Sequence, residues 1–196
     1  MIFTHYYHKD DCPFQNLSCL SEEEALRVIS DMDNRTGLAY RRFKEPVGYL
    51  KRRRETESWL RHEFVQKGGQ PASTYPHYFV VEQAIWIEEG YDGQSNKLQF
   101  PISAFSHKPV SFTYPDSMVS YWLRSQTDKV YYHPEYHGQV FMFDEIIKII
   151  DEFGIPNEEW RTEANRKYDL FIEAQVWNSE LAVLTPVGGE SRIVLR

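Results

Sequence analysis

The sequence has little cysteine, no long apolar run and no excess of basic charge, and each absence excludes a class of protein. Its two cysteines, Cys12 and Cys19, match no zinc-ribbon or redox spacing, and two reduced thiols are typical of a cytosolic protein. No stretch approaches the roughly 20 apolar residues of a membrane helix, and the first residues do not predict a signal peptide. The net charge of −7 disfavours general nucleic-acid binding. We therefore expect a soluble, cytoplasmic protein that binds neither membranes nor nucleic acid.

What the chain does contain is enough apolar and aromatic material for one packed domain. Aromatic residues make up 15% of the 196 residues, and no linker-like stretch divides them, so we predict a single globular domain over residues 1–196. Predicted strands and helices mix without a regular β-α-β alternation. This pattern favours an α+β fold with a mostly antiparallel sheet and several flanking helices.

Local signals place the elements of this fold. Ser21 and Glu24 form a capping box that predicts a helix, Pro46 precedes a second helix, and Gly154 ends a later one. The predicted helices cover about residues 21–32, 47–67, 117–124, 144–153 and 157–165. The predicted strands cover about residues 2–7, 77–81, 84–88, 97–102, 110–114, 139–143 and 168–177, with a returning segment at 180–186.

The basic residues are concentrated in the second predicted helix and the residues before it. Residues 41–67 hold nine basic and four acidic side chains, whereas the whole chain is acidic. Arg53 and Glu57 lie four residues apart in the middle of the apolar stripe of this helix, so their side chains can meet. One interpretation is a structural ion pair within the fold. The other is that the stripe faces a cleft, where Arg53, held by Glu57, receives an anionic group.

The last long strand has one apolar face and one polar face. Ile172, Ala174 and Val176 belong to the face that we assign to the core, whereas Glu173 and Gln175 belong to the other. The polar face is typical either of an ordinary exposed sheet surface or of the wall of a ligand cleft. In a cleft, Glu173 would be the candidate general base or hydroxyl-orienting carboxylate, and Gln175 a ligand-binding residue.

The histidines provide further candidates. His77 and Tyr78 open a strand and are candidate ligand-binding residues, although a structural histidine is the alternative. The pairs His5/His8 and His133/His137 could each supply two metal ligands, but the second pair departs from the His-Glu-x-x-His pattern and contains a proline. We therefore predict no metal site.

One layout is similar to that of the ADP-ribosyltransferase-like fold. Such domains carry a histidine or arginine on an early strand and a glutamate on a late one, which face each other across an NAD cleft. In this chain, His5 or His8 would be the early residue, Glu173 the late catalytic one, and Tyr78 a stacking aromatic. The likeness covers most of the chain in layout but rests on single residues, and no early-strand motif surrounds either histidine.

Three hypotheses about function follow. The first is a binding or interaction domain that takes a nucleotide, a phosphorylated metabolite or an acidic protein partner at the Arg53-centred basic surface. The second is a nucleotide-dependent enzyme with Glu173 as the carboxylate and Arg53 as the anion clamp. The third is a structural subunit of a larger assembly, which predicts a large exposed apolar patch. An enzyme requires Glu173, Arg53 and a histidine to meet in one pocket. The sequence identifies no particular cofactor.

Overall fold

The computed structural model describes residues 1–178, 181 and 187 of the chain. Apart from Leu181, the predicted returning segment 180–186 lies outside these residues. The strands are β1 (Ile2–His8), β2 (His77–Val81), β3 (Ser95–Pro101), β4 (Val110–Thr113) and β5 (Glu173–Val176). The α-helices are α1 (Glu22–Asp31), α2 (Pro46–Gln66), α3 (Ile85–Gly90), α4 (Ser117–Leu123) and α5 (Phe143–Phe153). Short 3-10 helices are η1 (Leu17–Cys19), η2 (Leu38–Lys44), η3 (Ile102–Ala104) and η4 (Glu158–Thr162).

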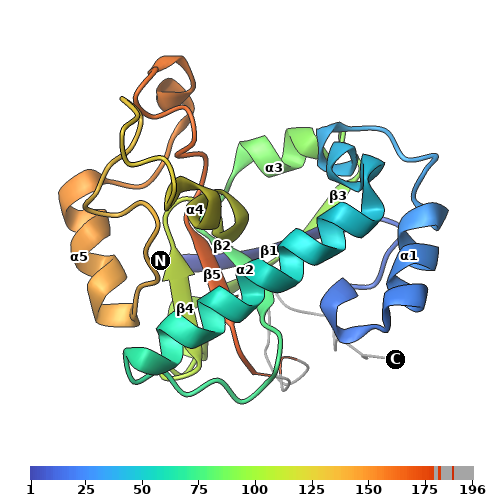
Figure 1. Cartoon of the computed structure of the whole chain (residues 1–196), viewed down its shortest axis with the longest axis horizontal. Coiled ribbons are helices and arrows are strands. Elements are labelled where there is room, and N and C mark those ends of the chain that lie inside the picture. Colours follow the sequence, from blue (N-terminus) through green and yellow to red (C-terminus); the bar gives the residue numbers. More distant parts are fainter. Residues whose placement is uncertain (179–180, 182–186, 188–196) are drawn as a thin grey trace.

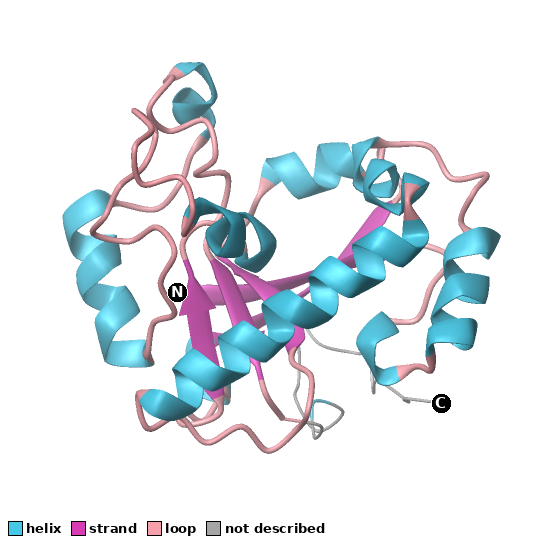
Figure 2. Cartoon of the chain, viewed as in Figure 1, coloured by secondary structure: helices cyan, strands magenta, loops and turns pink. Residues whose placement is uncertain are grey.

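The five strands form one antiparallel sheet in the order β3-β1-β2-β5-β4, and helices pack around it (Figures 1 and 2). This arrangement confirms the predicted α+β fold with an antiparallel sheet. The long helix α2 runs diagonally across the sheet, α5 lies beside β4, and α1 lies at the opposite end of the molecule (Figure 1). No helix in the described part of the chain combines the length and apolar character needed to cross a membrane.

Alternation along the strands gives the sheet one apolar and one polar face. Phe3, Phe79, Phe112 and Ala174 share the apolar face and belong to the largest core cluster, which Ile146 of α5 joins. The other face carries Thr4 of β1, Tyr78 and Val80 of β2, Glu173 and Gln175 of β5, and Ser111 and Thr113 of β4. The expected division of β5 into a core face and a polar face is therefore correct.

The polar face is covered rather than exposed. Helix α2 packs over it, where Phe64 stacks on the buried Trp177 at a ring-centroid distance of 6.1 Å. Gln175, Ser111 and Thr113 are completely buried and are joined by hydrogen bonds of 2.9 and 3.0 Å from the Ser111 hydroxyl and the Gln175 amide. An ordinary exposed sheet surface, one of the two expectations for this face, is thus excluded, because α2 packs Leu60 and Phe64 against Trp177 there.

The helix signals in the sequence correspond to the observed ends of α1 and α2. The Ser21 hydroxyl accepts from the Glu24 backbone N–H, while the Glu24 carboxylate accepts from the Ser21 N–H, as in a capping box. Pro46 occupies the first turn of α2, where a missing N–H costs nothing. The outer face of α2 carries Lys51, Glu55 and His62, which are exposed.

Two of the predicted strands are wrong. Residues 84–88 belong mostly to helix α3, because the chain leaves β2 through Glu82 in a left-handed conformation (φ 62°) and cannot continue as a strand. A short apolar run such as Ala84-Ile85-Trp86-Ile87 does not distinguish strand from helix by itself. Residues 139–143 contribute only an isolated bridge between Phe141 and Phe112, and α5 begins already at Phe143.

The last strand is shorter than predicted. Only Glu173–Val176 pairs in the sheet, whereas residues 168–177 were expected to form a strand. Asp169 is held away from the sheet in a buried cluster, where it accepts hydrogen bonds of 2.7 Å from the Tyr136 hydroxyl and from Nε2 of His137. Similarly, the segment expected as a helix over 157–165 contains only the short 3-10 helix η4.

Strands β1 and β2 separate soon after they meet. They pair only at Phe3–Val81 and Thr4–Val80, whereas β1 continues beside β3 as far as His8. In Figure 2, β1 and β3 run away from the other three strands. This divergence leaves room between the strands and the helices above them, and a cavity lies there.

Candidate functional site

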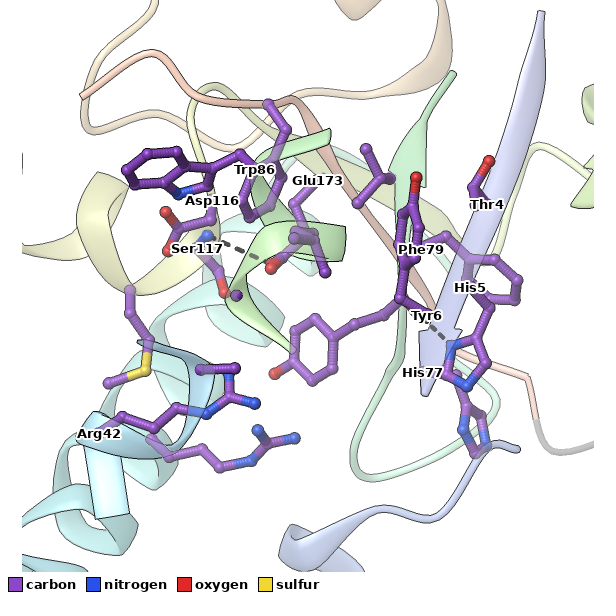
Figure 3. Close-up of a pocket in the computed structure, with 18 of the residues that line it drawn as sticks. Thr4, His5, Tyr6, Arg42, His77, Phe79, Trp86, Asp116, Ser117 and Glu173 are labelled. Carbon is purple, nitrogen blue, oxygen red and sulfur yellow. Dashed lines mark hydrogen bonds between the residues drawn. The ribbon is translucent and has the colours of Figure 1, made fainter. Parts of the chain in front are cut away.

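A cavity of about 520 Å³ opens on the polar face of the sheet where β1 and β2 diverge. Its walls come from β1, β2 and β5, from α2 and α3, from η2 and from the start of α4. The candidate residues that line it are His5, Arg53, His77, Tyr78 and Glu173, whereas Glu57 and Gln175 lie behind the walls. The cavity size is in the range of small-molecule sites. Figure 3 shows its acidic groups on one side and arginine side chains on the other.

Arg53 and Glu57 form a buried ion pair at the base of this cavity. Nε of Arg53 lies 3.1 Å from Oε1 of Glu57, and the two side chains are only 16% and 1% exposed. The same Glu57 oxygen accepts hydrogen bonds from the hydroxyls of Tyr78 (2.7 Å) and Ser18 (2.8 Å). The pair therefore connects α2 to β2 and to η1.

The Arg53 guanidinium donates hydrogen bonds to several protein groups. It donates to the Ser18 hydroxyl (2.7 Å), the Tyr49 hydroxyl (3.1 Å) and the Asn16 side-chain carbonyl (3.1 Å). Its carbon Cζ also lies 4.9 Å from the centroid of the Tyr78 ring. An arginine has five N–H groups, so these contacts leave about two that can donate into the cavity. Arg53 thus has a structural role, and it also presents donors to the cavity.

Two carboxylates meet on the opposite wall. Burial and the nearby charge of Asp116 raise the pKa of Glu173 to about 7. Oε1 of Glu173 accepts from the Ser117 backbone N–H (3.2 Å) and from the Gln175 amide (3.0 Å), as Figure 3 shows for the first. Gln175, which lies behind the cavity wall, therefore orients the Glu173 carboxylate. A carboxyl group with a pKa near neutrality can exchange a proton at physiological pH.

Asp116 is the N-cap residue of α4. Its carboxylate accepts from the Val119 N–H (3.1 Å) at the start of α4. Burial raises its pKa, while hydrogen bonds from the Val119 and Met118 backbone and the charge of Arg42 act in the opposite direction. Sequence reasoning did not connect Asp116 to Glu173, because 56 intervening positions separate the two in the chain and only the β4–β5 pairing brings them together.

Arg42 is a second functional candidate that the sequence did not single out. It lies on η2, lines the cavity and forms no ion pair within 4.0 Å among the described residues. The basic segment 41–67 contains it, but nothing in that segment distinguishes it from neighbouring surface arginines. Trp86 of α3 was also missed; it lines the cavity and is 37% exposed.

His5 is held by backbone groups on both sides of its ring. Its Nε2 accepts from the Phe14 N–H (3.0 Å), so Nδ1 carries the proton and donates to the Tyr78 carbonyl (2.9 Å). Burial lowers the pKa of His5 to about 4. Strand alternation also places its side chain on the face opposite to Glu173. This arrangement leaves no ring nitrogen of His5 for proton transfer, and our functional proposal does not include it.

We expect His5 to remain neutral from pH 8 to pH 5, with the proton on Nδ1, because burial disfavours the charged form. Long-range ¹H–¹⁵N correlation spectra of the uniformly labelled protein would show this tautomer and no titration in that range. The exposed His62 provides an internal control in the same spectra. A midpoint for His5 above pH 6 would contradict the buried backbone-bonded arrangement.

The other histidines are engaged elsewhere. His77 also belongs to the apolar face, and burial lowers its pKa. His8 is nearly buried, and its Nδ1 accepts from the Asp10 N–H (3.3 Å). His137 accepts from the His133 N–H (3.0 Å) and contacts Asp169, so it is part of the buried Asp169 cluster. Within the described residues, no group of three or more His, Cys, Asp and Glu side chains is arranged to hold a metal ion.

The arrangement therefore brings together three kinds of group around one cavity: arginines, a carboxylate pair and aromatic side chains. Tyr78, Trp86, Tyr91 and Phe171 supply the aromatic walls. Such a combination can hold a ligand that has an anionic group, a planar group and a hydroxyl. The chain itself matches no known protein-family profile, no curated protein and no solved structure.

Proposed function

We propose that the cavity binds a nucleotide or a phosphorylated sugar and that Glu173 acts on a hydroxyl of this ligand. The observation that carries the proposal is that Arg42 lies on one side of the cavity and Glu173 and Asp116 on the other, while Arg53 also lines it. Phosphate groups are matched by the planar donors of arginine. A sugar hydroxyl is matched by a carboxylate whose pKa lies near neutrality, because such a group can accept a proton or orient the hydroxyl.

Arg42 is the principal anion-binding group in this proposal. Its guanidinium has no carboxylate partner within ion-pair distance among the described residues, whereas Arg53 already serves Glu57 and three further groups. Arg53 adds its remaining N–H donors and fixes the Tyr78 ring beside the ligand. The Arg42 guanidinium lies over the Phe43 ring, with Cζ 5.1 Å from the ring centroid, so no ion pair must be broken before it engages an anion.

We include an enzymatic role because Glu173 and Tyr78 line one cavity, as the ADP-ribosyltransferase-like layout would place them. Glu173 is on the last described strand, and it faces the same cavity as Tyr78 of β2. The early-strand histidine of that layout has no counterpart in His5, whose ring nitrogens are both occupied. NAD is therefore the first nucleotide to assay, and release of nicotinamide is the first reaction to measure.

We expect Arg42→Gln to weaken the binding of ADP at least tenfold, because a charged hydrogen bond to phosphate contributes about 1.5–3 kcal/mol. Binding would be measured by calorimetry at fixed ionic strength. Arg54→Gln is the matched control, since Arg54 belongs to the same basic segment but pairs with Glu22 outside the cavity. Equal losses in both variants would indicate only a general effect of positive charge.

Glu173→Gln separates binding from catalysis. It keeps an oxygen acceptor for the Ser117 N–H but cannot accept a proton, so ADP should still bind while any nicotinamide release from NAD should fall at least a hundredfold. Unchanged turnover in this variant would exclude Glu173 as the catalytic carboxylate. ADP binding without turnover in the wild-type protein would favour the binding-domain hypothesis.

A further inference from the structure

A second cavity of about 460 Å³ adjoins the first. It lies between the end of β1, the η1 segment, α1 and η2. Arg42 and Arg53 line both cavities, so these two arginines stand at the border between them. Of the candidate residues that the sequence offered, Arg53, His5 and His8 also line this second cavity.

The second cavity differs from the first in its chemistry. Among the described residues that line it, Asp11 is the only carboxylate, and Arg35 binds it in a bidentate manner with both N–O distances at 2.6 Å. Arg35 also donates to the Tyr40 hydroxyl at 3.4 Å. These polar groups satisfy one another. Four apolar side chains that line the cavity form what we call its apolar wall: Leu17, Leu20, Val28 and Met32.

We propose that the second cavity binds a small amphipathic anion. Its aromatic or aliphatic part lies against the wall of Leu17, Leu20, Val28 and Met32, and its anionic group lies at Arg42. Burial of an apolar group against this wall is favourable. The Arg42 guanidinium, which forms no ion pair among the described residues, supplies the positive charge that attracts the anion. The site is independent of Glu173 and does not require that the first cavity bind a nucleotide. If the first cavity does bind a nucleotide, the nucleotide and the amphipathic anion compete for Arg42.

The reactivity of the two cysteines provides a measure of whether this cavity is occupied. Cys12 and Cys19 are both free, both exposed and both part of its lining. Burial raises the pKa of Cys19, so alkylation is best followed near pH 8.5. A ligand that occupies the cavity should shield both thiols from a small neutral reagent such as iodoacetamide.

The test uses the wild-type chain with two matched probes, the aromatic sulfonate 8-anilinonaphthalene-1-sulfonate and its uncharged analogue N-phenyl-1-naphthylamine. We expect the sulfonate to slow alkylation of both cysteines at least fivefold, as measured by mass spectrometry, and the uncharged analogue to bind at least fivefold more weakly. Arg42→Gln should abolish this difference. Equal binding of both probes to the wild-type protein, or no protection of either thiol, would overturn the proposal.

A pair of variants tests the apolar wall. Val28→Glu places a carboxylate in the wall and should weaken binding of the sulfonate at least tenfold. Val65→Glu, on the exposed side of α2, should leave this binding unchanged. Circular dichroism establishes that both variants are folded. The thiol-protection experiment uses only the wild-type chain, so its result does not depend on whether either variant folds. Equal weakening by both variants would overturn the assignment of the wall. Loss of ADP binding alone would count against the nucleotide proposal and leave this one standing.

Discussion

Replacing Glu57 with alanine is expected to lower the free energy of unfolding by about 3–5 kcal/mol. The substitution removes the counter-ion of Arg53, whose side chain is only 16% exposed, and leaves a buried positive charge. It also removes the acceptor of the Tyr78 and Ser18 hydroxyls. An unsatisfied buried hydroxyl adds its own desolvation cost to that of the unpaired charge.

Chemical denaturation of the wild-type and variant proteins measures this effect. Glu55→Ala is the matched control, because Glu55 is exposed on the same helix two residues away, and its substitution should change stability by less than about 0.5 kcal/mol. The double variant Arg53→Met, Glu57→Leu should recover much of the loss, since an apolar pair leaves no buried charge. If Glu57→Ala and Glu55→Ala were equally stable, the buried network would have no energetic role.

Glu173→Gln should stabilise the protein at pH 8 and have almost no effect at pH 4. The pKa of Glu173 is raised from 4.5 to about 7 in the folded state, so between these values the folded protein binds more protons than the unfolded chain. Stability attributable to Glu173 is therefore fully present below pH 4.5 and is lost as the pH rises to 7. Glutamine stays neutral throughout and avoids this loss.

The expected gain at pH 8 is on the order of 2–3 kcal/mol, because one pKa unit corresponds to about 1.36 kcal/mol. The measurement is the difference in unfolding free energy between wild type and variant at pH 4, 6 and 8. Contributions from other ionisable groups are common to both proteins and cancel in this difference. Glu135→Gln, an exposed carboxylate, should show a difference below about 0.5 kcal/mol at each pH. A destabilised Glu173→Gln at pH 8 would mean that the carboxylate is stabilised by its surroundings rather than strained.

These two predictions distinguish two buried acids that serve different ends. Glu57 has a nearby guanidinium and donors from two hydroxyls, so its charge is paired within the fold. Glu173 is buried beside another carboxylate, and the hydrogen bonds from Ser117 and Gln175 do not offset this, so its charge is unfavourable. A protein commonly retains such an unfavourable group where function requires it. This contrast supports the proposal that Glu173, rather than Glu57, carries chemistry.

Elements with local signals at their ends were predicted well. The capping box at Ser21, the proline at Pro46 and the glycine at Gly154 mark the observed helix ends to within one or two residues. Residues 84–88 carried no such signal and were predicted wrongly, because a left-handed Glu82 decides the outcome there. Backbone conformation at a single non-glycine residue depends on the packing around it, and a sequence pattern does not display it.

The sequence by itself determined the fold class, the division of the β5 segment into a core face and a polar face, and the meeting of Arg53 with Glu57. All three depend on neighbours within a few positions of the chain, where helix and strand periodicity suffices. Only the tertiary structure decided that α2 covers the polar face, that Asp116 stands beside Glu173, and that Arg42 lies across the cavity from them. These juxtapositions come from strand pairing and helix packing between distant segments, which local patterns do not encode.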